Sequence, residues 1–179
     1  VDDNRLHVSP SAMENGRERR CKGGKRITNL SVCSWSVEGF TDLKYHETCK
    51  YMELQGIHIC CMQEVRKPNS DYYVEDTGHL VITSGTSNVT TEWAGVGFII
   101  CPALRGQVQF LQLNNRACSI KVKTHNGSAC ITNVYAARNL VVNVEDKFKF
   151  YDDLERHVNS FSSNGLRIVV GDMNARLGE

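Results

Sequence analysis

Three acidic side chains directly follow apolar, strand-like stretches of the 179-residue chain, where they could share a metal ion. Glu38 follows "SVCSWSV", Glu64 follows "ICCMQ" and Asp172 follows "IVVG". If these strands end at one edge of a sandwich, the three carboxylates converge, and they repel one another unless a cation lies among them. Ligands that are all oxygen favour a hard ion, Mg²⁺ or Mn²⁺. Such an ion binds phosphate and stabilises charge on a phosphoryl oxygen.

Hydrogen-bonding side chains accompany the acids at these strand exits. Ser36 precedes Glu38, Asn174 follows Asp172, and Tyr135 ends a fourth apolar stretch, "ITNVY". Hydroxyl, amide and phenol groups can donate to a phosphoryl oxygen. Each residue also has a plain structural explanation, since Asp and Asn form turns after strands and Tyr packs at strand edges. The set of four exits, rather than any single residue, therefore indicates a site.

The composition fits one globular domain and gives no global sign of a partner. Hydrophobic residues make up 41% of the chain, charged residues make up 23%, and the formal net charge is +1. So balanced a charge cannot steer the whole molecule to nucleic acid or to a membrane, which leaves only local patches. The sequence has no apolar run long enough to span a bilayer, and we expect no membrane partner.

The first 25 residues are expected to form a basic, disordered arm in front of a folded domain, 26–179. This stretch has almost no apolar periodicity. Its end is rich in basic residues: Arg17, Arg19, Arg20, Lys22, Lys25 and Arg26. Such a cluster is compatible with a solvated tail, with a nuclear-import signal, or with an arm that contacts the phosphates of nucleic acid.

The eight cysteines indicate the compartment of the protein. They form no Cys-x-x-Cys pair, and most lie inside apolar runs such as "IHICCM". We therefore expect reduced, buried thiols and an intracellular location, with the nucleus as one option. Disulfides are the alternative.

Two helices and a series of short strands should position the candidate residues. One helix is expected over 41–56, capped by Thr41 or Asp42 and ended by Gly56, with Leu43, Cys49 and Met52 on its apolar side. The other is expected over 144–161, with an apolar side formed by Phe148, Tyr151, Leu154, Val158 and Phe161. Strands are expected at 27–35, 57–63, 79–83, 94–100, 108–113, 118–123, 129–135 and 166–172. Asn126-Gly127 indicates a hairpin turn between two of them.

This order of elements predicts an α+β fold in which two packed sheets carry helices on their outer faces. Four segments then resemble the motifs of the endonuclease/exonuclease/phosphatase superfamily, which has the DNase I-like four-layer α/β/β/α sandwich. They are "VCSWSVEGF", "ICCMQEVR", "ITNVYAA" and "VVGDMNARLG". Their order and spacing agree with the family from about Ile27 to Gly178. The finer resemblance, in "GDMNARLG" and "FYDDLERHV", is to endonuclease domains of retrotransposons and to craniofacial development protein 2-like proteins.

The resemblance implies a role for each candidate. Glu64 would be the principal ligand of Mg²⁺ or Mn²⁺, with Glu38 in support. Asp172 would orient or activate the attacking water. Asn174 and Tyr135 would position or stabilise the scissile phosphate.

The chain also departs from the family pattern. Ser36 stands where the family has Asn, and Ala137 stands where it has Pro. The family ends with a Ser-Asp-His segment whose His contributes to catalysis, and none of the histidines here has that context. We therefore expect a domain that lacks its C-terminal strands.

The family resemblance implies Mg²⁺-dependent hydrolysis of a phosphodiester, with DNA as the partner, by an endonuclease of retrotransposon or base-repair type. Two alternatives stay open. The chain could be a catalytically impaired remnant that binds phosphate, nucleic acid or protein. It could also act on the substrates of the phosphatase or deadenylase branches of the superfamily.

Overall fold

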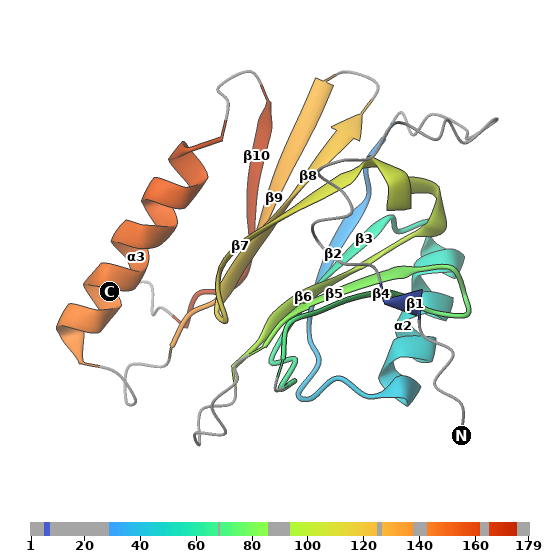
Figure 1. The fold of residues 1–179 in the computed structure, drawn as a ribbon, viewed down its shortest axis with the longest axis horizontal. Helices are drawn as coiled ribbons and strands as arrows, with labels where there is room; N and C mark the ends of the chain where they lie inside the picture. Colours follow the sequence, from blue (N-terminus) through green and yellow to red (C-terminus); the bar gives the residue numbers. More distant parts are fainter. Residues whose placement is uncertain are drawn as a thin grey trace.

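A computed structural model of the chain describes residues 6–7, 29–67, 69–85, 94–124, 127–137, 143–161 and 165–174. Two sheets pack face to face, and one helix covers the outer face of each (Figure 1). This confirms the predicted four-layer α/β/β/α order. Among the described residues, neither helix combines the length and the apolar character that crossing a bilayer requires.

The larger sheet has six strands in the order β1-β4-β5-β6-β3-β2. Their bounds are β1 (Leu6–His7), β2 (Val32–Ser36), β3 (Ile59–Gln63), β4 (Asp71–Val74), β5 (Leu80–Ser84) and β6 (Val96–Ile100). β2 and β3 are parallel neighbours, and the other pairs are antiparallel. β2 and β3 therefore end side by side at the same edge, which matters for the site.

The smaller sheet has four strands in the order β10-β9-β8-β7. Their bounds are β7 (Val108–Asn114), β8 (Ala117–Thr124), β9 (Gly127–Tyr135) and β10 (Leu166–Asp172), and the short 3-10 helix η1 (Pro102–Gln107) precedes β7. β8 and β9 pair from Thr124 to Gly127 as a hairpin, as predicted, although Asn126 lies outside the described residues. β10 runs parallel to β9, so these two strands also end side by side.

Helix α2 (Asp42–Gln55) covers the six-stranded sheet and has the caps that its sequence predicts. The Thr41 hydroxyl accepts from the backbone N–H of Lys44 at 3.3 Å, and Gly56 ends the helix in the left-handed conformation with φ 64°. Cys49 and Met52 are buried against the sheet together with Tyr45. The placement of Leu43 on the apolar side was wrong, because this side chain is 68% exposed.

Helix α3 (Val144–Asn159) covers the four-stranded sheet. Leu154 is buried there, and Tyr151 and Val158 pack beside it. The predicted apolar side was wrong at Phe148, which is 67% exposed. Phe150 packs against this cluster instead, because it lies on the same side of the helix as Leu154, four residues further on.

The main core lies between the two sheets. Alternate residues of each strand point inward, among them Ile59, Ile82 and Phe98 from the larger sheet and Ile120 and Ile131 from the smaller one. Burial of these side chains fixes the register of both sheets, since a shift by one residue would turn them outward. The described cysteines are free thiols: Cys33, Cys49, Cys60, Cys61, Cys101, Cys118 and Cys130.

Candidate active site

The ends of four strands meet at one rim of the sandwich. Ser36 ends β2, Gln63 ends β3, Tyr135 ends β9 and Asp172 ends β10. Ser36 is paired with Gln63 and Asp172 is paired with Tyr135, each pair in parallel register. β10 also packs against β2 and β3 of the other sheet. Parallel pairing within the sheets and packing between them therefore bring the predicted residues to one place.

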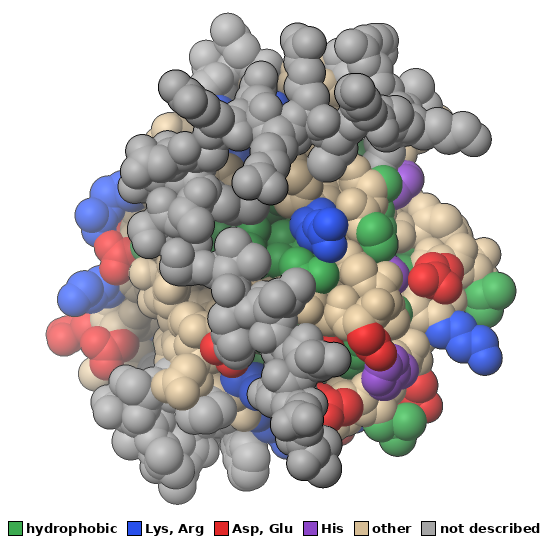
Figure 2. Space-filling view, turned by 45° about the vertical axis from the view of Figure 1, so that its right-hand side comes forward, with side chains coloured by type: hydrophobic (Ala, Val, Ile, Leu, Met, Phe, Trp, Pro, Cys, Tyr) green, Lys and Arg blue, Asp and Glu red, His purple; other side chains and the backbone are tan. Residues whose placement is uncertain are grey.

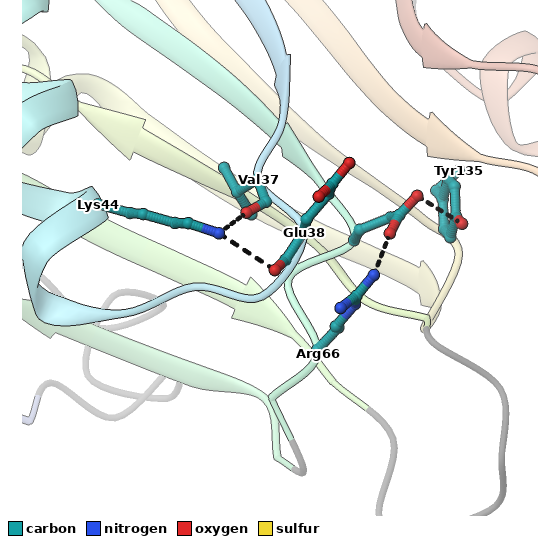
Figure 3. Close-up of polar contacts among 6 residues, drawn as sticks. Val37, Glu38, Lys44, Arg66 and Tyr135 are labelled. Carbon is teal, nitrogen blue, oxygen red and sulfur yellow. Dashed lines mark hydrogen bonds and ion pairs between the residues drawn. The ribbon is translucent and has the colours of Figure 1, made fainter.

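A hydrogen bond joins the two sheets directly at this rim. Tyr135 Oη donates to Glu64 Oε1 at 3.0 Å, and Arg66 Nη2 donates to Glu64 Oε2 at 2.6 Å. Figure 3 shows Arg66 and Tyr135 on two sides of the carboxylate that they contact. Glu64 is only 7% exposed, and polar groups at that depth need hydrogen-bond partners. The site therefore holds a buried carboxyl group that is fixed from two directions.

The backbone at the rim is in an unusual conformation. Among the described non-glycine residues, positive φ values occur at Glu38, Glu64, Arg66 and Asn174, which all lie here. Left-handed backbone at a residue with a Cβ costs on the order of 1 kcal/mol, and it persists where the surrounding structure enforces it. Such strain is typical of functional sites, because it aims side chains in directions that regular strands do not allow.

The loop that carries Glu38 is tied to the exit of β3. The backbone N–H of Val37 donates to Gln63 O at 2.9 Å, and that of Gly39 donates to Glu64 O at 2.7 Å. Lys44 reaches back from α2, and its ammonium donates to the carbonyls of Val37 and, at 3.1 Å, Glu38 (Figure 3). The Glu38 side chain is exposed on this loop. Lys44 thus holds the loop that presents Glu38 next to Glu64.

Asp172 and Asn174 form a turn that clamps the ends of β9 and β10 together. Asp172 Oδ1 accepts from the backbone N–H of Asn174 at 2.8 Å, and its carbonyl accepts from Ala136 N at 2.9 Å. The Asn174 side-chain amide donates to Ala136 O. Burial and the nearby Asp172 carboxylate raise the pKa of the Tyr151 phenol. The turn explanation of these residues and a functional one are compatible, since the turn fixes Asp172 beside Tyr135.

Beneath the rim, a buried polar pair bridges the two sheets. Gln63 Nε2 donates to Asn133 Oδ1 at 2.7 Å. Asn133 Nδ2 in turn donates to the carbonyls of Met62 and Gly97, at 2.8 Å each. Both side chains are 2% exposed or less, so their polar groups depend on each other. Because Gln63 precedes Glu64 and Asn133 lies two residues before Tyr135, the pair fixes the spacing at which those two groups meet.

The structure says less about the other residues that the sequence predicts for the site. Ser36 is exposed at the end of β2, on the strand face that also carries Ser34, whose hydroxyl donates to Gln63 Oε1 at 3.2 Å. The arm residues lie outside the described residues: Arg17, Arg19, Arg20, Lys22, Lys25 and Arg26. On the described part of one face, Figure 2 shows acidic and basic side chains interspersed. Contacts to a charged ligand would therefore depend on local groups such as those at the rim.

The described residues could hold a divalent cation only through one or two carboxylates. Within the described ranges, no three His, Cys, Asp or Glu side chains gather closely enough to form a metal-binding group. Mg²⁺ commonly binds proteins through one or two carboxylates and completes its shell with water and substrate phosphate. Glu64, with Glu38 on the adjoining loop, fits that mode, and the Arg66 contact with Glu64 would have to open.

Several solved structures superpose on most of this chain. The endonuclease domain of TRAS1, a telomere-specific non-LTR retrotransposon, superposes with a TM-score of 0.58 at 15% identity, over 83% of this chain and 62% of that one. A humanized D. rerio TDP2 with 14 mutations gives 0.56 at 13% identity, over 84% and 64%. The AP endonuclease LMAP from Leishmania major gives 0.56 at 12% identity, over 91% and 65%.

The chain has the DNase I-like fold. The family resemblance of the sequence is thereby confirmed at the level of the fold. At these identities the likeness shows the fold alone, and the chain spans less than two thirds of the length of each of the three structures. No protein-family model matches the sequence. No curated protein matches it either.

Sequence reasoning missed three residues that shape this DNase I-like rim. Arg66 gave no signal, because its direction depends on a left-handed backbone that its residue type does not suggest. Lys44 looked like any exposed helix lysine. Asn133 did carry a signal, since it shares the inward parity of Ile131 and Tyr135 and a buried amide in that pattern demands a partner.

Proposed function

We propose that the chain is the metal-dependent phosphodiesterase part of a DNA endonuclease. The observation that carries this proposal is the hydrogen bond between Tyr135 and Glu64, which joins the two sheets of a DNase I-like fold beside Asp172. Two of the similar structures are an endonuclease domain of a retrotransposon and an AP endonuclease, which supports DNA as the substrate. The basic cluster at 17–26 supports the same substrate through phosphate contacts.

In this proposal each residue of the chain has a defined task. Glu64, with Glu38 in support, holds Mg²⁺ or Mn²⁺, and the bound ion would supply electrostatic stabilisation of the phosphoryl oxygens. Asp172 orients the attacking water and accepts its proton, because the Asn174 N–H contact fixes one carboxylate oxygen and a carboxylate has further acceptor positions. Asn174 orients the scissile phosphate with the amide hydrogen that it does not donate to Ala136 O. Tyr135 helps to position the phosphate indirectly, by holding the Glu64 carboxylate.

A nicking assay tests this function. Supercoiled plasmid is incubated with the chain and Mg²⁺, and the wild type is compared with Glu64→Ala. The matched control is Glu47→Ala, an exposed glutamate of α2. We expect nicking by the wild type and the control, abolished by a chelator, and a loss of about 100-fold or more in the Glu64 variant. Equal nicking by Glu64→Ala and wild type would refute the assignment.

A second candidate function is a phosphate-binding module without turnover. Two observations favour it: Ser36 has a shorter reach than the Asn of the family motif, and Arg66 already occupies the Glu64 carboxylate. This alternative predicts that duplex DNA binds, as measured by fluorescence anisotropy, while neither the wild type nor Ser36→Asn nicks the plasmid.

A further inference from the structure

We infer that Arg66 is a displaceable counter-ion, which holds the Glu64 carboxylate until a divalent cation takes its place and then turns to a phosphate of the substrate. This inference rests on the proposed function of the same rim. It assigns to Arg66 a positioning role in cation binding and a contact role in substrate binding.

The backbone places the two side chains on one side of the chain. Val65, between them, is fully buried in the core under α2, and its N–H donates to Gly95 O at 3.0 Å. The N–H of Arg66 donates to Ala94 O, also at 3.0 Å. Glu64 and Arg66 both have φ 55°, so the segment turns at each of them. Residues two positions apart share a face in a regular strand as well. Here the two turns also carry Glu64 and Arg66 beyond the end of β3, onto the rim.

The ion pair is asymmetric in exposure. The Glu64 side chain is 9% exposed, whereas that of Arg66 is 30% exposed. The stem of Arg66 passes over Gly39, since a Cβ at that glycine would lie 3.7 Å from Arg66 Cδ. The Arg66 guanidinium therefore lies nearer to solvent than the Glu64 carboxylate, which is held between Tyr135 and the end of β3.

A cation and the guanidinium cannot share the carboxylate at low cost. Arg66 Nη2 lies 2.6 Å from Glu64 Oε2, which is within the space that a cation and its water shell would occupy. Two positive charges at such a separation repel each other strongly, because little water lies between them to screen the interaction. Cation binding thus expels Arg66, and cation and arginine compete for Glu64.

The expelled guanidinium stays tethered at the rim, where the phosphate is proposed to bind. Arginine binds phosphate oxygens through two parallel N–H donors, and it keeps its charge at all working pH values. Binding of the cation would then make a phosphate contact available in the same step.

The test measures Mn²⁺ binding by isothermal titration calorimetry for wild type, Arg66→Gln, Arg66→Lys and Glu64→Gln. We expect Arg66→Gln to lower the dissociation constant for Mn²⁺ about fivefold, because a partly exposed ion pair contributes about 1 kcal/mol. Arg66→Lys keeps the charge and should stay near the wild type, and Glu64→Gln should lose binding. Arg66→Met, which keeps the apolar stem, replaces Arg66→Gln if circular dichroism shows the latter unfolded. An unchanged or higher dissociation constant in the neutral variant overturns the inference.

The second arm measures the affinity for duplex DNA in saturating Mn²⁺, with Asp172→Asn in every protein to prevent cutting. Here Arg66→Gln should bind at least about threefold more weakly, because a phosphate contact is lost. Undiminished DNA affinity would refute the contact role.

The nicking assay separates this inference from the proposed nuclease function. Nicking that needs Glu64, with no effect of Arg66→Gln on Mn²⁺, refutes the inference alone. Tighter Mn²⁺ in Arg66→Gln without nicking refutes the function alone.

Discussion

Replacing Tyr135 by Phe isolates the bond that joins the two sheets at the rim. The substitution removes only the phenol oxygen, whose hydrogen donates to the Glu64 carboxylate at 3.0 Å. A hydrogen bond to a charged group contributes about 1.5–3 kcal/mol, and the acceptor here is buried. Since Arg66 still holds the other oxygen, we expect a loss of about 2 kcal/mol in the free energy of unfolding. For a domain of this size, that lowers the unfolding midpoint by about 4–8 °C.

The assay is urea denaturation of Tyr135→Phe, Glu64→Ala and the double variant. The bond predicts a coupling energy of about 1–2 kcal/mol between the two positions. Tyr151→Phe is the control, because its phenol donates at 2.9 Å to the uncharged carbonyl of Met173. It should cost about 1 kcal/mol and add to Glu64→Ala within about 0.5 kcal/mol. A coupling below about 0.5 kcal/mol at Tyr135 would show that the phenol does not hold Glu64.

Three further predictions concern the frame around the rim. Asn133→Leu removes the donor to two buried carbonyls and should cost about 3 kcal/mol in urea denaturation. Burial lowers the pKa of His79 and of His157 below 6.5. The unfolded chain therefore takes up protons first on acidification, and the free energy of unfolding should fall as the pH drops through about 6.5. Gly171→Ala should destabilise by about 3 kcal/mol or more, since its Cβ would lie 1.9 Å from a carbonyl oxygen of β9.

Each of these has a control or a contradicting result. A cost below about 1 kcal/mol for Asn133→Leu would mean that the buried pair is dispensable. Stability that stays level between about pH 7.5 and pH 5.5 would contradict the histidine assignment. Gly127→Ala is the matched glycine control, because its φ of 129° resembles the 131° of Gly171 but nothing lies within 4 Å of its Cβ. Equal losses at the two glycines would remove the steric argument.

The sequence predicted the layers and the strand exits because both follow from local patterns. Alternating or fully apolar runs identified most strands, and Thr41 and Gly56 identified the ends of α2. β4 was missed, because "DYYV" is four residues long and follows a polar turn. Leu43 and Phe148 were assigned to buried sides, but each lies off the helix face that packs on its sheet.

The site was predictable in its residue types but not in its contacts. Glu64 and Tyr135 were chosen for their places at strand ends, and the bond between them spans 71 positions. Such pairings depend on how the sheets pack, which periodicity does not encode. Arg66 depends on two left-handed residues, a conformation that is uncommon outside glycine. The roles of the predicted residues in catalysis, and that of the basic cluster at 17–26, remain predictions.

The most direct test of the shared rim is Mn²⁺-induced broadening of backbone amide signals in an NMR spectrum. Mn²⁺ is added to the wild type and to Glu64→Gln. We expect signals from all four exits to broaden together, measured at Gly39, Glu64, Ala136 and Asn174, while Gly127 at the opposite end of β9 stays sharp. We also expect Glu64→Gln to remove the broadening. Broadening confined to one exit, or equal in the two proteins, would contradict the claim that these strands form one cation site.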